Sequence, residues 1–131
     1  CKVMDLIIKS DTFDINCITI KNGKNSKKII YDLGEIYLIG LSFQIDGFNI
    51  VNQTKKYIYI DITESPQNKI LSIIDNHFKN NNKPYKHFIN GNIIEVKKHK
   101  IYTIKKNDNL FISINNIKTR GTFSKVQLFT I

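Results

Sequence analysis

The chain has 131 residues, of which 41% are hydrophobic and 24% are charged, and it carries a formal net charge of +9 at pH 7. This composition excludes wholesale disorder, and the length predicts a single domain that spans residues 1–131. No apolar run approaches the length of about 18 residues that a membrane-spanning helix needs, so we expect no membrane span.

Almost all of the positive charge comes from lysine, since only one of the 20 basic residues is an arginine, Arg120. Lysine, isoleucine and asparagine are all frequent and all have A/T-rich codons, so the basic charge also fits an A/T-rich genome. Arginine is the residue that suits bidentate recognition of bases and phosphates. The composition therefore disfavours sequence-specific recognition of nucleic acid, although lysines can still make non-specific phosphate contacts.

Alternating apolar residues predict several strands before the middle of the chain. Short strands are expected over residues 2–9, 13–21 and 28–32, with a tight turn at the Asn22-Gly23 dipeptide between the last two. A longer strand is expected over residues 35–46. Its apolar face is unbroken and consists of Tyr37, Ile39, Leu41, Phe43 and Ile45.

The clearest strand signal lies in residues 55–63. Three isoleucines fall on one face of this strand, and Tyr57, Tyr59 and Asp61 fall on the other. Such alternation is typical of a half-buried strand, and β-branched and aromatic residues favour it further. We expect one shared core that consists of Ile39, Leu41, Phe43, Ile58, Ile60, Ile62, Ile112 and Ile114.

A single helix is expected over residues 66–79, directly after this strand. Ser65 suits the N-cap position, and Pro66 suits the first helical position, where its missing N–H costs nothing. Apolar residues at helical spacing predict that one side of the helix packs against a sheet. They are Ile70, Leu71, Ile74 and Phe78.

Further short strands are expected after the helix, over residues 86–89, 92–98, 100–105, 110–117 and 123–131. Turn signals recur about every 8–12 residues, which is typical of an antiparallel sandwich or barrel. The sequence therefore predicts an all-β, mainly antiparallel sandwich with one short helix inserted at about residues 66–79.

No stretch carries a catalytic motif. The three histidines, His77, His87 and His99, have no Cys or Glu at metal-ligand spacing. The sequence also lacks a nucleophile elbow and a glycine-rich phosphate loop. We therefore expect no enzymatic activity, no cofactor and no metal. For Cys1 and Cys17 we expect two unlinked thiols with Cys17 packed in a strand, and a bridge between them is the alternative.

The order of parts in residues 34–131 resembles that of a known group of viral proteins. Residues 34–41 lead to the strand at 57–62, a Leu/Ile-rich segment follows at 69–74, and Phe-Ile-Ser-Ile-Asn-Asn at 111–116 precedes a turn at Gly121 and a last apolar strand. This resembles the jelly-roll minor capsid or penton proteins of eukaryotic double-stranded DNA viruses and of virophage and Maverick-type elements. The resemblance implies a jelly roll of two four-stranded sheets, no catalytic residues, symmetric neighbours in a shell and a location in the virion.

The expected function is accordingly that of a structural assembly protein, which binds copies of itself or other shell proteins. Aromatic residues are prominent at the centres of such contacts. The candidates for the assembly surface are Tyr57, Tyr59 and Phe111.

Two alternative functions stay open. The first is an intracellular OB-like barrel that binds single-stranded nucleic acid through strands 35–46 and 56–63, with tyrosines that stack on bases. Its candidate phosphate contacts are Lys55, Lys56, Lys97, Lys98, Lys105 and Lys106. The second is a secreted or surface adhesion sandwich, for which the two cysteines and the glycosylation triplet Asn52-Gln53-Thr54 are the support.

Overall fold

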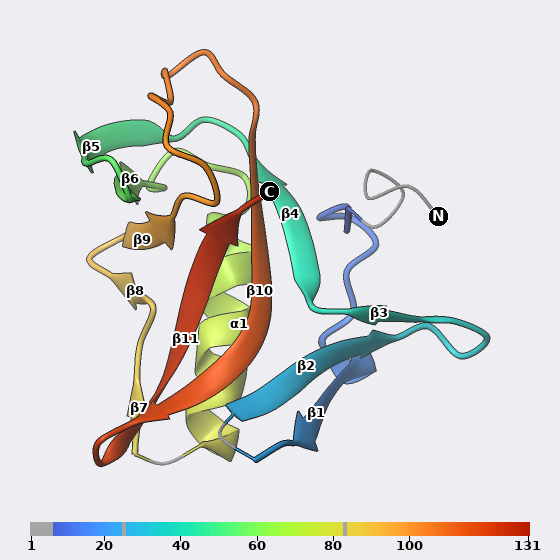
Figure 1. The fold of residues 1–131 in the computed structure, drawn as a ribbon. Coiled ribbons are helices and arrows are strands. Elements are labelled where there is room, and N and C mark those ends of the chain that lie inside the picture. The colour runs from blue at the N-terminus through green and yellow to red at the C-terminus, as the bar shows by residue number, and fades with distance from the viewer. Residues whose placement is uncertain (1–6, 25, 83) are drawn as a thin grey trace.

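The computed structural model describes residues 7–24, 26–82 and 84–131, and it is mostly β with one α-helix (Figure 1). The predicted all-β sandwich class with one short helix is confirmed. The elements in chain order are the 3-10 turn η2 (Ile15–Cys17), β1 (Ile18–Asn22), β2 (Ser26–Asp32), β3 (Tyr37–Ile39), β4 (Leu41–Ile45), β5 (Asn49–Gln53), β6 (Tyr57–Asp61), α1 (Asn68–Asn81), β7 (Tyr85–Lys86), β8 (Ile89–Asn90), β9 (Ile93–Lys97), β10 (Leu110–Arg120) and β11 (Phe123–Thr130).

Part of the sheet closes into a ring of strands. β4 pairs with β10, β10 with β11, β11 with β9, β9 with β6, and β6 with β5. Only a short corner at residues 46–48 separates β4 from β5, so these two strands are the halves of one bent segment. Every pair in the ring is antiparallel except β9 and β11, which run parallel.

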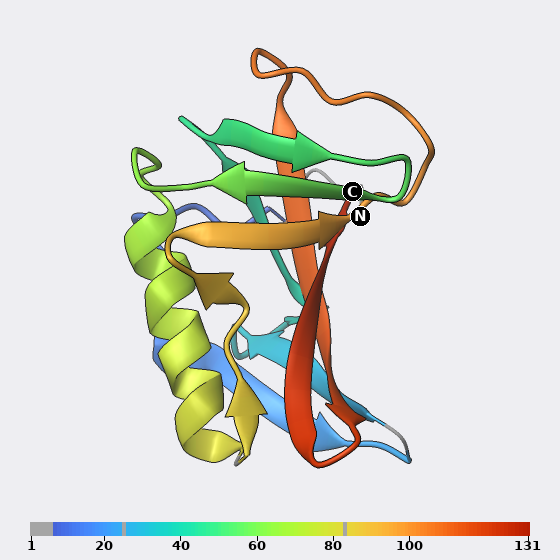
Figure 2. The same cartoon turned by 90° about the vertical axis from the view of Figure 1, so that its left-hand side faces the viewer.

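The two layers of the sandwich are therefore opposite walls of one curled sheet. Figure 2 shows β5, β6 and β9 crossing the long β10–β11 hairpin at a steep angle. The resemblance implies two separate four-stranded sheets, whereas hydrogen bonding here runs through one sheet. The cause is β10, which pairs with β4 near its start and with β2 beyond a bulge between Ile114 and Ile117.

The core lies inside this ring. Seven of the eight predicted core residues are fully buried, and they are Leu41, Phe43, Ile58, Ile60, Ile62, Ile112 and Ile114. Ile39 is the exception, because 68% of it is exposed. Gly40 adopts a φ of +85°, which turns the chain between β3 and β4. The single strand predicted over 35–46 is thus wrong: its second half enters the core, and its first half pairs with β2 outside it.

The helix covers one end of the ring and buries Leu71, Ile74 and Phe78, as its apolar stripe predicts. It begins two residues later than expected, at Asn68, so Ser65 is not the N-cap. Instead, Ser65 and Gln67 are buried and bonded to each other. The Gln67 Oε1 accepts from the Asp46 N–H at 2.8 Å, and this bond ties the start of the helix to the β4–β5 corner.

Two other expectations for local structure differ from the fold, and a third falls mostly outside the described residues. Most of the strand predicted over 2–9, and also Cys1, lie outside the described residues. The strand predicted over 13–21 begins only at Ile18, because η2 precedes it, and Cys17 lies half-buried in that turn instead of in a strand. Residues 100–105 form no strand but belong to a loop that joins β9 to β10.

Candidate nucleic-acid interface

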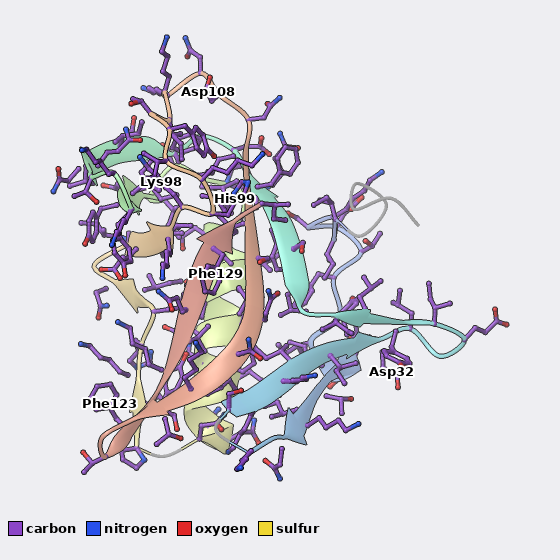
Figure 3. The ribbon with its side chains drawn as sticks, viewed as in Figure 1. Asp32, Lys98, His99, Asp108, Phe123 and Phe129 are labelled. Carbon is purple, nitrogen blue, oxygen red and sulfur yellow. The ribbon has the colours of Figure 1, made fainter. Side chains whose placement is uncertain are left out.

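The outward side chains of β6, β9, β11 and the second half of β10 form one continuous surface, which we call the outer face. Tyr57 and Tyr59 on β6 lie directly opposite Lys97 and Glu95 on β9. Beyond β9, alternate residues of β11 share this face, while Val126 and Leu128 between them are buried in the core. Those outward residues are Phe123, Lys125, Gln127 and Phe129, and Figure 3 shows Phe123 and Phe129 near the two ends of β11.

Two hollows of about 280 and 320 Å³ adjoin on the outer face, and we call them together the groove. Glu95, Lys125 and Gln127 line both hollows. Tyr59, Lys86 and His87 are among the residues that line the first, and Tyr57, Lys118 and Phe123 complete the second. The groove thus combines aromatic rings, ammonium groups and one carboxylate.

Three lysines stand side by side along one wall of the groove. Lys125 on β11 pairs with Lys118 on β10 and with Lys86 on β7, so Lys86, Lys125 and Lys118 form a row across three strands, the lysine row. Like charges directly opposite each other destabilise a sheet. Within the described residues, the one ion pair joins His87 to Asp75, so none of these three lysines forms an ion pair there. An arrangement that costs stability in this way suits an anionic ligand.

The two tyrosines stand on the opposite wall. Tyr57 and Tyr59 are half-buried and share the outward side of β6. Burial raises the pKa of Tyr59, and the neighbouring Glu95 carboxylate raises it further. Two strand spacings, or about 10 Å, separate β6 from β11. Aromatic rings and ammonium groups therefore line the groove from opposite sides.

A buried carboxylate fixes the end of the groove to the helix. Asp75 on α1 accepts hydrogen bonds from the Tyr85 hydroxyl at 2.8 Å and the Phe88 N–H at 3.2 Å, and its other oxygen lies 2.8 Å from the His87 Nδ1. Burial, followed by the bond to Asp75, raises the pKa of Tyr85. The His87 Nδ1 faces Asp75, so the His87 Nε2 is the ring nitrogen that remains available on the groove side.

The fold brings some predicted site residues together and separates others. Tyr57 and Tyr59 share the groove, and Lys97 lies beside them. Phe111 does not join them, because it pairs with Gln44 at the β4 edge of β10. Lys55 and Lys56 are exposed in the turn that precedes β6, at the edge of the outer face.

Three of the predicted phosphate contacts lie in the loop region between β9 and β10. Lys105 and Lys106 are exposed on this loop, away from the groove. Lys98 is only 7% exposed, and its Nζ donates to the Gln53 Oε1 and to the Thr54 and Tyr102 carbonyls at 2.6–2.8 Å. Burial lowers the pKa of Lys98. Its prediction as a surface phosphate contact is therefore wrong, because the fold already uses its ammonium group.

The two strands that the nucleic-acid alternative names lie apart in the fold. The strand at 56–63 supplies the tyrosine wall, but the segment 35–46 lies outside the groove, and β9, β10 and β11 take its place. Sequence reasoning missed the lysine row and Phe123. The alternation of Phe123, Lys125, Gln127 and Phe129 along β11 was the signal for one part of this surface.

Nowhere in the described ranges do three or more His, Cys, Asp or Glu side chains converge as metal ligands would. No helix in these ranges has the length and apolar character needed to cross a membrane. Comparison with known proteins adds no relative: no family model, no curated protein and no solved structure matches the chain.

Proposed function

We propose that the chain is a single-stranded nucleic-acid-binding protein and that the groove is its binding surface. The observation that carries the proposal is the lysine row, which faces Tyr57 and Tyr59 across the groove. Proteins that bind single strands combine a positive groove along the phosphates with aromatic rings on which bases stack. Lysine suits this role because the phosphate contact needs charge and no particular geometry.

The architecture supports the same proposal. A ring of five strands, closed through a bend in the first, is the plan of an OB-like barrel. Such barrels bind oligonucleotides on the face of their second and third strands and on the loops that join strands one to two and four to five. Here those strands are β6 and β9, and the loops are residues 54–56 and the turn at 121–122. The likeness concerns architecture, so the chemistry of the groove carries the functional argument.

The binding mode follows from the layout of the groove. Bases stack on Tyr57 and Tyr59, and the phosphates run along the lysine row. Lys97, Lys55 and Lys56 lie near the tyrosine end, where they can contact the next phosphates. Each phosphate that a lysine neutralises releases counterions, so affinity must fall as salt rises.

The test is the affinity of the protein for a fluorescent single strand of mixed sequence, measured by anisotropy across a range of salt. Three phosphate contacts predict a slope of about −2 in a plot of log affinity against log salt. The double variant Lys118→Ala/Lys125→Ala should reduce this slope by about one to two. Tyr57→Ala and Tyr59→Ala should each lose about 1–3 kcal/mol of binding.

Matched controls separate the groove from the general charge of the protein. Lys69→Ala/Lys79→Ala removes two exposed lysines from α1, behind the sheet in Figure 1, and should leave the slope unchanged. Tyr37→Ala removes an exposed tyrosine from β3 and should leave affinity unchanged. Removing a lysine from the row also relieves repulsion, so those variants should fold at least as stably as the parent. No binding at low salt, or equal losses in the controls, would contradict the proposal.

Self-assembly is a second candidate function, and the hairpin of β2 and β3 is the observation that favours it. Figure 1 shows this hairpin projecting from the body of the molecule. Four of its large apolar side chains are 49–68% exposed: Leu33, Ile36, Tyr37 and Ile39. Exposed apolar clusters of this kind mark contact sites. In this proposal the hairpin docks on another copy or on a shell protein, as the viral resemblance implies.

The assembly proposal is tested by the mass of the protein in solution over a range of concentration. Self-association that Ile39→Lys abolishes is the expected result, because a charge on the hairpin would have to be buried in the contact. Asn76→Lys adds the same charge at an exposed position of α1, away from the hairpin, and is the control for the change of charge alone. A parent protein that stays monomeric at high concentration contradicts assembly with its own copies.

A further inference from the structure

We infer that Glu95 and Gln127 recognise base edges in the groove and that the protein prefers guanine among the bases of a single strand. This inference rests on the proposed function and adds a substrate preference to it. Arginine, the usual residue for recognising guanine, is not needed here, because a carboxylate can accept from the two N–H donors on the opposite edge of that base.

The starting observation is the position of the Glu95 carboxylate. Glu95 is exposed at the middle of the groove and lines both hollows, together with Lys125 and Gln127. No lysine of the described residues pairs with it, since the one ion pair there joins His87 and Asp75. The carboxylate lies beside the Tyr59 hydroxyl, and after burial it is the next cause that raises the pKa of Tyr59. A negative charge without a lysine partner weakens the binding of phosphates in this groove, so we assign Glu95 a role toward the bases.

The layout of the groove determines which part of a nucleotide meets Glu95. The strand order β6, β9, β11, β10 places Glu95 between the tyrosine wall and the lysine row. Phosphates are repelled from a carboxylate and attracted to the row. A base that stacks on Tyr59 therefore extends its edge toward β9, where Glu95 lies directly opposite Tyr59.

Gln127 completes the recognition surface. Glu95 and Gln127 each precede one member of the parallel pair Val96–Leu128, so their side chains emerge together on the outer face. An ionised carboxylate only accepts hydrogen bonds and has two oxygens, whereas an amide both donates and accepts. The pair thus places the two acceptor oxygens of Glu95 beside an amide whose Nε2 can donate.

Guanine is the base whose edge matches this set. Its N1–H and its exocyclic N2 amine are adjacent donors that suit both oxygens of one carboxylate, and its O6 can accept from the Gln127 Nε2. Such charge-assisted bidentate bonds are among the strongest in proteins. Uracil and thymine place one N–H between two carbonyl oxygens, which a carboxylate repels. Single-stranded bases are open to this kind of recognition because their Watson–Crick edges are unpaired.

The experiment compares three DNA single strands of about 12 nucleotides, a length within the site size of one such barrel. One alternates guanine and thymine, one replaces each guanine by inosine, and one is thymine throughout. Inosine lacks only the N2 amine, so it is a matched probe of the second bond to Glu95. We expect the guanine strand to bind about tenfold more tightly than the other two.

The variant Glu95→Gln should remove this preference. It should lower affinity for the guanine strand to the level of the other two strands, which do not depend on this contact and gain, if anything, from the loss of a negative charge in an anion-binding groove. Glu64→Gln, which removes an exposed carboxylate near the start of α1, should retain the preference and serves as the control. A merely electrostatic role of Glu95 would change affinity for all three strands by the same factor, so the ratio between guanine and inosine is the decisive measurement.

The possible outcomes separate this inference from the proposed function. Salt-dependent binding of all three strands with equal affinity would leave the proposed function standing and overturn guanine recognition. A guanine preference that survives Glu95→Gln would overturn the role of Glu95. An absence of binding to any strand would overturn both.

Discussion

At the scale of single residues, two adjacent lysines have opposite roles. Lys97 is half-buried on the outer face beside Tyr57, whereas Lys98 points inward and donates three hydrogen bonds. One of its acceptors, Gln53, also binds both polar groups of the Ile104 backbone, at 2.7 and 2.9 Å. Figure 3 shows Lys98 beneath the loop that carries Asp108. Lys98 and Gln53 thus hold the loop between β9 and β10 against the ring.

We predict that Lys98→Met lowers the free energy of unfolding by about 1–3 kcal/mol, because it removes the donor of three hydrogen bonds, to the Gln53 side chain and to the Thr54 and Tyr102 carbonyls. Urea denaturation measures this loss. Lys97→Met removes the same charge from the neighbouring position and should cost less than about 0.5 kcal/mol, as surface changes usually do. Equal losses in the two variants would show that the three hydrogen bonds contribute nothing beyond charge.

At the scale of elements, the turn at Gly40 decides where the apolar residues of segment 35–46 go. A Cβ at this position would meet the Asn115 side chain and lie 3.2 Å from the Ile114 carbonyl oxygen. Gly40 also has a φ of +85°, a backbone conformation that residues with a Cβ disfavour. Gly40 therefore permits both the turn and the close approach of β10.

We predict that Gly40→Ala lowers the free energy of unfolding by more than about 2 kcal/mol, through backbone strain together with the clash. Gly34→Ala is the matched control. Gly34 has a similar φ of +93°, but a Cβ there would meet nothing within 4 Å. Its cost should be the backbone term alone, about 1–2 kcal/mol. If thermal or urea denaturation gave the two variants equal costs, the contact with β10 would be irrelevant to stability.

Alternation along the chain predicted the elements that carry their own signal. The strands around Ile60 and Ile112 and the helix with its stripe were predictable, since each pattern lies within one continuous segment. The break at Gly40 was not predictable. The apolar alternation continues through Gly40 in the sequence, and only the backbone conformation of Gly40 ends the strand there. The lysine row could not be predicted either. Its members come from three strands, and they meet only once the register of β7, β10 and β11 is known.

At the scale of the whole molecule, the two candidate surfaces belong to different strands. The groove lies over β6, β9, β11 and part of β10, whereas the projecting hairpin consists of β2, which pairs with the second half of β10, and β3. A nucleic acid in the groove would leave the hairpin free to contact a neighbour. Binding and assembly can therefore coexist in one protein, and variants of one surface should leave the other unaffected.

The parallel pairing of β9 and β11 has a further consequence for the ring. It joins residues 96–97 to residues 128–129 only, so it is the narrowest seam in the closed wall. A seam this short opens readily in local fluctuations, which amide hydrogen exchange detects. Glu95 and Gln127 flank this seam. A single strand that stretches from Tyr59 to Lys125 would bridge this seam. It would hold β9 and β11 together and slow the hydrogen exchange of the amides on both sides.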